Sequence, residues 1–158
     1  MEIKLGERTE ETVAIYHARS QRDEIRRFLP QRQRTLQEAL EDYRKTLLPG
    51  STSFGRTILL NRRYVGDIWC YGMHAEQEPD AMLSYCVFEK DCLNRGVATQ
   101  AVKLFLQEAA QRFGLKTIGA FVYEANAACI RVLEKSGFRL IEAFAEDGVM
   151  SRYYQKRI

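Results

Sequence analysis

The segment 92–99, Cys-Leu-Asn-Arg-Gly-Val-Ala-Thr, places a glycine turn after a strand-like run and immediately before an apolar helix. The first N–H groups of a helix have no intrahelical partners, and they point the same way at the positive end of the helix dipole. Such a turn is a site for a phosphate or pyrophosphate group. The chain is therefore expected to hold a phosphorylated cofactor at this turn.

Metal chemistry is not expected. The four cysteines, Cys70, Cys86, Cys92 and Cys129, contain no C-x-x-C pair, and the two histidines lie far apart in sequence. This pattern lacks the ligand spacing of a structural zinc site. Cys70 and Cys86 lie in strand-like runs and are interpreted as small buried thiols, which fits a reducing compartment.

Length and composition indicate one ordinary globular domain. The 158 residues are 46% hydrophobic and 28% charged, with a net charge of +3. Outside segment 19–34 the basic residues are scattered, whereas nucleic-acid binding usually needs a dense basic stripe. The apolar runs are too short to cross a membrane, and the first eight residues lack the core of a secretory signal. We expect residues 1–158 to form one cytoplasmic domain that binds neither nucleic acid nor membrane.

Caps and periodicity predict the elements that position the turn. Thr9, Thr35 and Asn126 are expected N-caps, and Glu38 completes a capping box with Thr35. The predicted helices are one starting at Thr9, then 23–29 ending before Pro30, one from Thr35 to about residue 47, then 97–113 and 127–136. The predicted strands are 53–60, 64–73, 81–88, 117–122, 138–145 and 150–157.

Two of these strands, 81–88 and 117–122, are apolar on both faces, as central strands of a covered sheet are. The helix between them makes a crossover unit, which joins parallel neighbours. The phosphate turn then lies at the carboxyl edge of the first strand. The sequence predicts a mixed α+β domain with one central sheet.

Two motifs resemble those of the GNAT superfamily of acetyl-CoA-dependent N-acetyltransferases. One is Asn-Arg-Gly-Val-Ala-Thr at 94–99, and the other, at 126–138, is similar to the family pattern N-x-x-S-x-R-V-x-E-K-x-G-F, with Cys129 where serine is usual. The resemblance implies acetyl-CoA as cosubstrate. It also implies a central, mostly antiparallel sheet with a parallel, splayed strand pair and flanking helices.

The resemblance further implies a set of cofactor-binding residues. Main-chain N–H groups of the turn would bind the pyrophosphate, Arg95 and Arg131 would pair with phosphates, and the pantetheine arm would lie between the two central strands. A bulge near Cys86, Val87 and Phe88 would leave a free N–H for the thioester carbonyl, and Asn126 would contact the pantetheine amide. The turn residues implied are Asn94, Arg95, Gly96, Val97, Ala98 and Thr99.

The catalytic positions depart from the usual family pattern. Several family members have a glutamate five residues before the motif asparagine or a tyrosine seven residues after it, where this chain has Phe121 and Leu133. This departure favours the branch that acetylates N-terminal amines of ribosomal proteins. Cys129 is then a candidate proton donor to the leaving thiolate, or a packed side chain. Glu124 is the first candidate base, ahead of Glu89 and His74.

The favoured hypothesis is therefore direct acetyl transfer, in a ternary complex, to a protein N-terminal α-amine. A small-molecule amine (polyamine, amino acid or aminoglycoside) is one alternative acceptor. A non-catalytic acyl-CoA-binding module is another alternative. Residues that select the amine are expected in segments 23–50 and 73–80. The expected oligomeric state is a monomer or a homodimer.

Overall fold

The computed structural model describes residues 1–29, 33–74, 76 and 78–158. The strands among these residues are β1 (Ile3–Gly6), β2 (Phe54–Leu60), β3 (Arg63–Tyr71), β4 (Ala81–Val87), β5 (Thr117–Tyr123), β6 (Arg139–Glu146) and β7 (Val149–Arg157). The α-helices are α1 (Glu10–Ser20), α2 (Asp23–Arg26), α3 (Leu36–Thr46), α4 (Val97–Phe113) and α5 (Ala127–Lys135). A short 3₁₀ turn, Lys90–Cys92, joins β4 to the start of α4.

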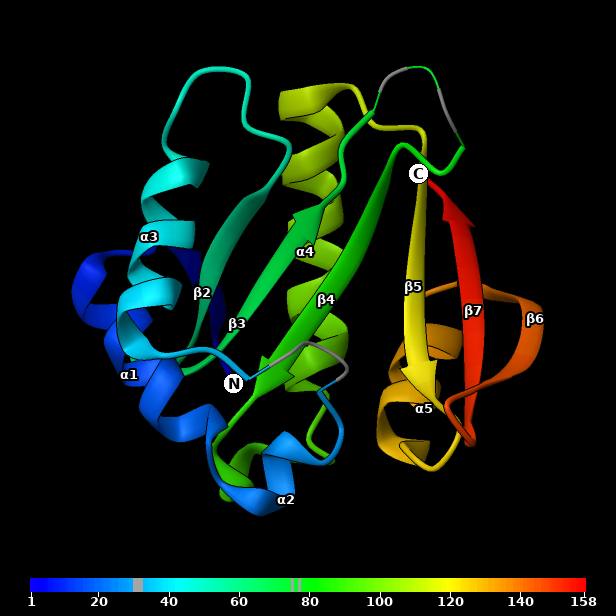
Figure 1. The fold of residues 1–158 in the computed structure, drawn as a ribbon, viewed down its shortest axis with the longest axis horizontal. Helices are drawn as coiled ribbons and strands as arrows, with labels where there is room; N and C mark the ends of the chain where they lie inside the picture. Colours follow the sequence, from blue (N-terminus) through cyan, green and yellow to red (C-terminus); the bar gives the residue numbers. More distant parts are fainter. Residues whose placement is uncertain (30–32, 75, 77) are drawn as a thin grey trace.

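These strands form one sheet in the order β1-β2-β3-β4-β5-β7-β6. The β4–β5 pair is parallel and the other pairs are antiparallel. In Figure 1, α4 crosses behind the sheet, and α1 and α3 lie together over its front. The predicted mixed α/β fold, with a mostly antiparallel sheet, a parallel central pair and flanking helices, is confirmed.

Local sequence signals account for most element boundaries. Thr9 caps α1, and Thr35 and Glu38 form the predicted capping box at the start of α3. The turn between β2 and β3 uses Asn61 and Arg62 in the left-handed region, at φ of 49° and 70°. Left-handed residues at both central positions give a two-residue hairpin whose twist matches the strands. Asp147 and Gly148 do the same between β6 and β7.

Two features differ from the predicted elements, and a third cannot be compared. The first residues form β1 along the edge of β2, which the alternating charged and apolar residues did not reveal. The second helix, predicted over 23–29, is a single turn, Asp23–Arg26. Pro30, predicted to end that helix, lies outside the described residues.

The core lies between α4 and the sheet. It includes Ile58, Ile68 and Ile118 from the strands and Val102 and Phe105 from α4, all of them fully buried. This layer fixes the start of α4 relative to the ends of β4 and β5.

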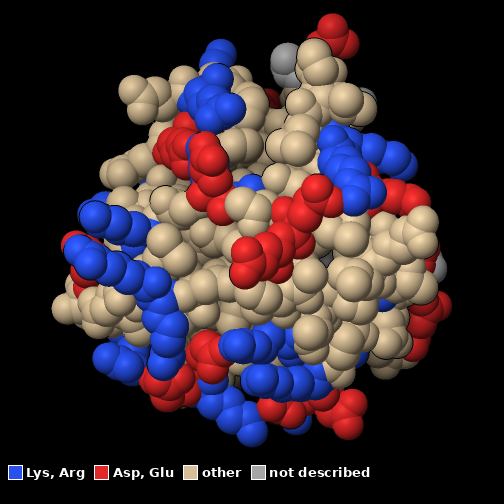
Figure 2. Space-filling view, turned by 90° about the vertical axis from the view of Figure 1, so that its left-hand side faces the viewer, with Lys and Arg blue, Asp and Glu red and all other residues tan. Residues whose placement is uncertain are grey.

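The surface of the described residues carries mixed charge. Figure 2 shows basic and acidic side chains intermixed over the face of the molecule that it presents. The helices in this part of the chain include none long and apolar enough to span a bilayer. Within the same residues, His, Cys, Asp and Glu side chains form no group of three that could hold a metal ion.

Candidate active site

The predicted phosphate turn lies between the 3₁₀ turn and α4. Asn94 and Gly96 adopt left-handed conformations, with φ of 60° and 79°, and Gly96 is the N-cap of α4. The amide of Gln100 donates to the Gly96 carbonyl at 3.1 Å, so the amides of Val97, Ala98 and Thr99 precede the first intrahelical bond. A Cβ built on Gly96 would meet no described atom within 4 Å. The space over the turn is therefore open.

The two arginines that were predicted to pair with phosphates make different contacts. Arg131, on α5, donates from Nη2 to the Asn94 side-chain oxygen at 3.4 Å, which brings the second motif against the turn of the first. Arg95 donates from Nη1 to the Asp91 carbonyl at 3.3 Å and is exposed. Both cations lie beside the open turn, so the residues present fit an anionic ligand such as a pyrophosphate.

A gap opens between β4 and β5 next to this turn. The parallel ladder joins Ala81 to Ile118 and Met82 to Gly119, and β5 diverges beyond these pairs (Figure 1). Phe88 donates its amide to the Val65 carbonyl on β3 at 2.9 Å. Because antiparallel strands alternate their hydrogen-bonding residues, Cys86 and Ser84 also face β3, whereas Tyr85 and Val87 face the gap.

The bulge predicted near 86–88 was wrong. The β3–β4 register runs from Tyr71–Met82 to Gly66–Val87 without a shift. Among the described residues the Val87 N–H has no strand partner, because β4 loses its pairing with β5 after Met82. Gly66 lets the two strands come this close, since a Cβ there would lie 2.3 Å from the Cys86 carbonyl oxygen. Of the three predicted residues, Val87 presents its main chain to the gap, while Cys86 and the buried Phe88 pair with β3.

Asn126 and Cys129 lie at the start of α5, beside β4. The Asn126 side chain accepts from the Cys129 amide at 3.2 Å, which is the predicted cap. The Cys129 thiol lies 3.1 Å from the Tyr85 hydroxyl, within hydrogen-bond distance. Burial raises the pKa of Cys129 to about 11 and also raises the pKa of Tyr85 well above its ordinary value. Both groups therefore stay protonated at neutral pH and can donate.

Two of the three candidate bases form ion pairs. Glu124 follows the end of β5 and lies 3.5 Å from Arg152 of β7. Glu89 forms an ion pair with Arg19 of α1. The His74 amide donates to the Asp80 carbonyl at 2.8 Å, in the loop before β4. Of these three, Glu124 follows Tyr123, which lines a cleft on the α1 and α3 face of the sheet.

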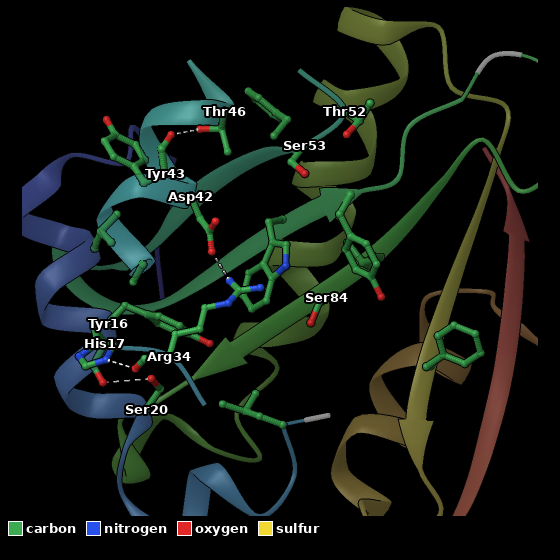
Figure 3. A pocket seen from close by; sticks show the side chains of 18 of the residues that line it. Tyr16, His17, Ser20, Arg34, Asp42, Tyr43, Thr46, Thr52, Ser53 and Ser84 are labelled. Atoms are coloured by element: carbon green, nitrogen blue, oxygen red, sulfur yellow. Dashed lines mark hydrogen bonds and ion pairs between the residues drawn. The ribbon is translucent and has the colours of Figure 1, made fainter. Parts of the chain in front are cut away.

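A cleft of about 1000 Å³ lies on the α1 and α3 face of the sheet and reaches the β4–β5 gap. Figure 3 shows Tyr16 and His17 from α1, Asp42 and Thr46 from α3, and Ser84 on β4 around it. Arg34 contacts both helices that line the cleft. Its Nη1 lies 3.0 Å from Oδ2 of Asp42 on α3, and its carbonyl oxygen lies 2.7 Å from Nε2 of His17 on α1. Residues of segment 23–50, where acceptor-selecting residues were expected, line the cleft, whereas none of the described residues in 73–80 does.

A buried polar group supports one end of this cleft. Asp67 of β3 is fully buried and lies 3.3 Å from Arg8, and it accepts a hydrogen bond from the Tyr64 hydroxyl. Burial raises the pKa of Asp67 to about 6, against the opposing effect of the Arg8 charge. Sequence reasoning missed Arg8, Asp67 and Tyr16. An aspartate flanked by Gly66 and Ile68 in an apolar strand was the available signal.

The sequence profile of the acetyltransferase (GNAT) domain matches residues 6–139 of this chain. The chain belongs to the GNAT acetyltransferase family. As a GNAT member it is an N-acetyltransferase whose cosubstrate is acetyl-CoA. No curated protein matches it in sequence.

Solved structures share this GNAT fold. An aminoglycoside acetyltransferase AAC(6')-Ib with coenzyme A has a TM-score of 0.80 and 17% identity, over 99% of this chain and 95% of that one. A spermidine N-acetyltransferase from Vibrio cholerae with CoA and spermine has a TM-score of 0.86 and 12% identity, over 98% and 95%. RimL, a ribosomal L7/L12 α-N-protein acetyltransferase in a disulfide with CoA, has a TM-score of 0.80 and 17% identity, over 99% and 94%. These acceptors differ, so the GNAT fold does not select among them.

Proposed function

We propose that this GNAT enzyme acetylates the α-amine of a protein N-terminus. The supporting observation is the charge of the acceptor cleft. Its described lining holds four cationic side chains, Arg8, Arg26, Arg34 and Lys45, and three carboxylates, Asp42, Glu146 and Asp147. Arg8 is also paired with the buried Asp67, so the cleft carries no excess of carboxylates. A polyamine or aminoglycoside carries several positive charges, and complementary recognition would need an excess of carboxylates. A peptide end offers one amine followed by neutral amides.

The proposed chemistry uses the gap and the cleft together. The neutral amine attacks the thioester carbonyl, so that the C–N bond forms as the C–S bond breaks. The Val87 N–H is positioned to stabilise the developing oxyanion. Cys129 donates a proton to the leaving sulfur, and Glu124 accepts the proton lost by the amine, through solvent. The diphosphate is held by the turn and by α5, through Asn94, Arg95, Gly96, Val97, Ala98, Thr99 and Arg131. Asn126 would lie beside the pantetheine arm.

An α-amine makes modest demands on a base. Its pKa of about 7.7 to 8 leaves it partly neutral near pH 7, whereas a lysine-like amine of about 10.4 must first lose a proton. Positioning can then carry much of the reaction. We also propose that residues 1–158 work as one domain in the cytoplasm, as a monomer or homodimer. The four cysteines are free, which suits a reducing compartment.

An acceptor panel tests this proposal. The enzyme is incubated with acetyl-CoA and with peptides beginning in Ser or Ala, their Nα-blocked counterparts containing lysine, spermidine and kanamycin, and free thiol is followed. Thiol release with the unblocked peptides alone is expected. Release with spermidine or kanamycin but not with peptides would overturn the acceptor class. Thermal stabilisation by CoA without any release would indicate a non-catalytic acyl-CoA-binding module.

A further inference from the structure

A second cavity continues the acceptor cleft beyond α3. Its volume is about 500 Å³, and it shares Arg8, Tyr43, Thr46 and Phe54 with the wall of the first. In Figure 3, Tyr43, Thr46 and Ser53 lie at the end of the cleft away from His17 and Ser20. The two hollows are therefore neighbours along one face of the sheet, separated by residues that line both.

A row of paired residues leads from the reacting gap to this second cavity. Ser84 of β4 pairs with Trp69 of β3, and Trp69 pairs with Gly55 of β2. Ser84 and Trp69 line the first cleft, and Gly55 lines the second cavity. Two strand spacings make this row about 10 Å long. An extended peptide advances about 3.3 Å per residue, so one whose amine lies in the gap reaches Gly55 with about its fourth or fifth residue.

Arg8 stands at the junction of the two cavities. Its guanidinium is held by the ion pair with Asp67, and its side chain is 17% exposed. Gly55 makes room for it, because a Cβ there would lie 2.8 Å from Arg8 Nη1. The Arg8 Nε is buried and has no hydrogen-bond partner among the described residues. The Arg8 guanidinium lines both cavities, so its exposed N–H groups, rather than the buried Nε, can donate to peptide carbonyls there.

The lining of the second cavity differs from that of the first. Leu47 and Leu48 are 66% and 61% exposed at the end of α3, and Phe113 is 40% exposed at the end of α4. Arg112 lies over the Phe54 ring at 4.9 Å. Apolar side chains beside a cation favour a segment that combines apolar and acidic residues.

We infer that this second cavity, bounded by Leu47, Leu48, Arg112 and Phe113, binds the downstream residues of a polypeptide acceptor, from about the fifth residue onward. The inference rests on the proposed function, because it assumes that the amine belongs to a peptide. A small amine bound in the gap would not reach it. The enzyme then selects its substrate by a stretch of sequence as well as by the terminal residue.

Nested peptides test this inference. Three-residue and eight-residue peptides with the same N-terminus are compared by kcat/KM, and the longer is expected to exceed the shorter at least tenfold. Leu48→Asp should reduce that advantage to about twofold and leave the three-residue peptide unchanged, while Leu48→Met should retain it. Equal rates for both lengths in the native enzyme would overturn the inference, as would a Leu48→Asp variant that slows both alike.

A charge exchange adds an independent readout. An eight-residue peptide with Asp at position six should exceed its Lys counterpart severalfold, and Arg112→Glu should reverse this order. An unchanged order in the variant would count against the cavity as a peptide site. Failure of the proposed function is distinguishable, since neither peptide would then be acetylated at any length while another amine of the panel was.

Discussion

Gly96 combines a left-handed conformation with open space above it, and this combination allows a test of charge alone. Asn and Asp both tolerate φ near 79°, and no described atom lies within 4 Å of a Cβ there. Gly96→Asp should weaken CoA binding at least tenfold more than Gly96→Asn, because the carboxylate would lie among the phosphates. Calorimetric titration with CoA measures the difference. Equal affinities of the two variants would remove the diphosphate from this turn.

Cys129 differs from its sequence-based interpretation in one respect. A thiol of ordinary pKa would match a leaving thiolate, but burial raises the pKa of Cys129 to about 11. The leaving sulfur would enter the same apolar surroundings beside Tyr85, where burial raises its proton affinity as well.

Replacement of Cys129 separates catalysis from packing. Cys129→Ala should lower kcat about tenfold with little change in KM, since the donor acts on the leaving group, while Cys129→Ser keeps a donor and most of the rate. Because the thiol stays neutral, no ionisation of Cys129 should appear in the pH profile below about pH 9. An undiminished rate in the alanine variant would assign this side chain to packing.

The alternation of hydrogen bonding along β4 predicts a pattern of amide exchange. Cys86 faces its antiparallel partner β3, whereas Tyr85 and Val87 face the gap. Without CoA, the Tyr85 and Val87 amides should exchange at least about a hundredfold faster than that of Cys86. Saturating CoA should slow the two exposed amides and leave Cys86 unaffected. Hydrogen–deuterium exchange resolved by NMR would show this, and uniform protection along the strand would contradict the assigned geometry.

Elements with strong local signals were predictable from the sequence. Thr35 with Glu38, Asn126, Gly114 and the Asp147-Gly148 turn each fix a boundary by their own hydrogen bonds or dihedral angles. The fold followed, because two strands apolar on both faces and one crossover helix leave few arrangements.

Other features depend on contacts distant in sequence. β1 is a four-residue edge strand fixed by its pairing with β2. The free N–H at Val87 depends on where β5 diverges, which no residue of β4 encodes. Arg8 and Asp67 lie far apart in the sequence and meet only in the folded chain. The acceptor cleft is likewise formed by side chains from α1, α3 and several strands, so its charge could not be read from one segment.

The free energy of unfolding of the whole molecule should depend on pH through the titration of Asp67. Its pKa rises from an ordinary 3.8 to about 6 in the folded state, so between these values the folded chain retains a proton that the unfolded chain has lost. Its contribution to the free energy of unfolding is therefore largest below about pH 4, falls as pH rises, and levels above about pH 6. A pKa difference of this size corresponds to about 3 kcal/mol of stability.

Asp67→Asn isolates this contribution. The variant has no titratable group at this position, so the pH dependence that Asp67 confers is present in the native enzyme and absent from the variant. The difference in free energy of unfolding between the native and variant enzymes should change by up to about 3 kcal/mol between pH 4 and pH 6. Urea unfolding at pH 4, 5, 6 and 7 measures it. Parallel curves for the two proteins would show that Asp67 does not titrate in this range.

The divergence of β4 from β5 after two residue pairs also bears on how the protein behaves between reaction cycles. When nothing occupies the gap, two interior strands present unsatisfied peptide groups, much as the rim of an open sheet does, and such rims attract extended segments of other molecules. The cosubstrate would thus occupy the position of a strand in the gap and prevent self-association of the protein. Warmed solutions lacking coenzyme should scatter light sooner than those containing it.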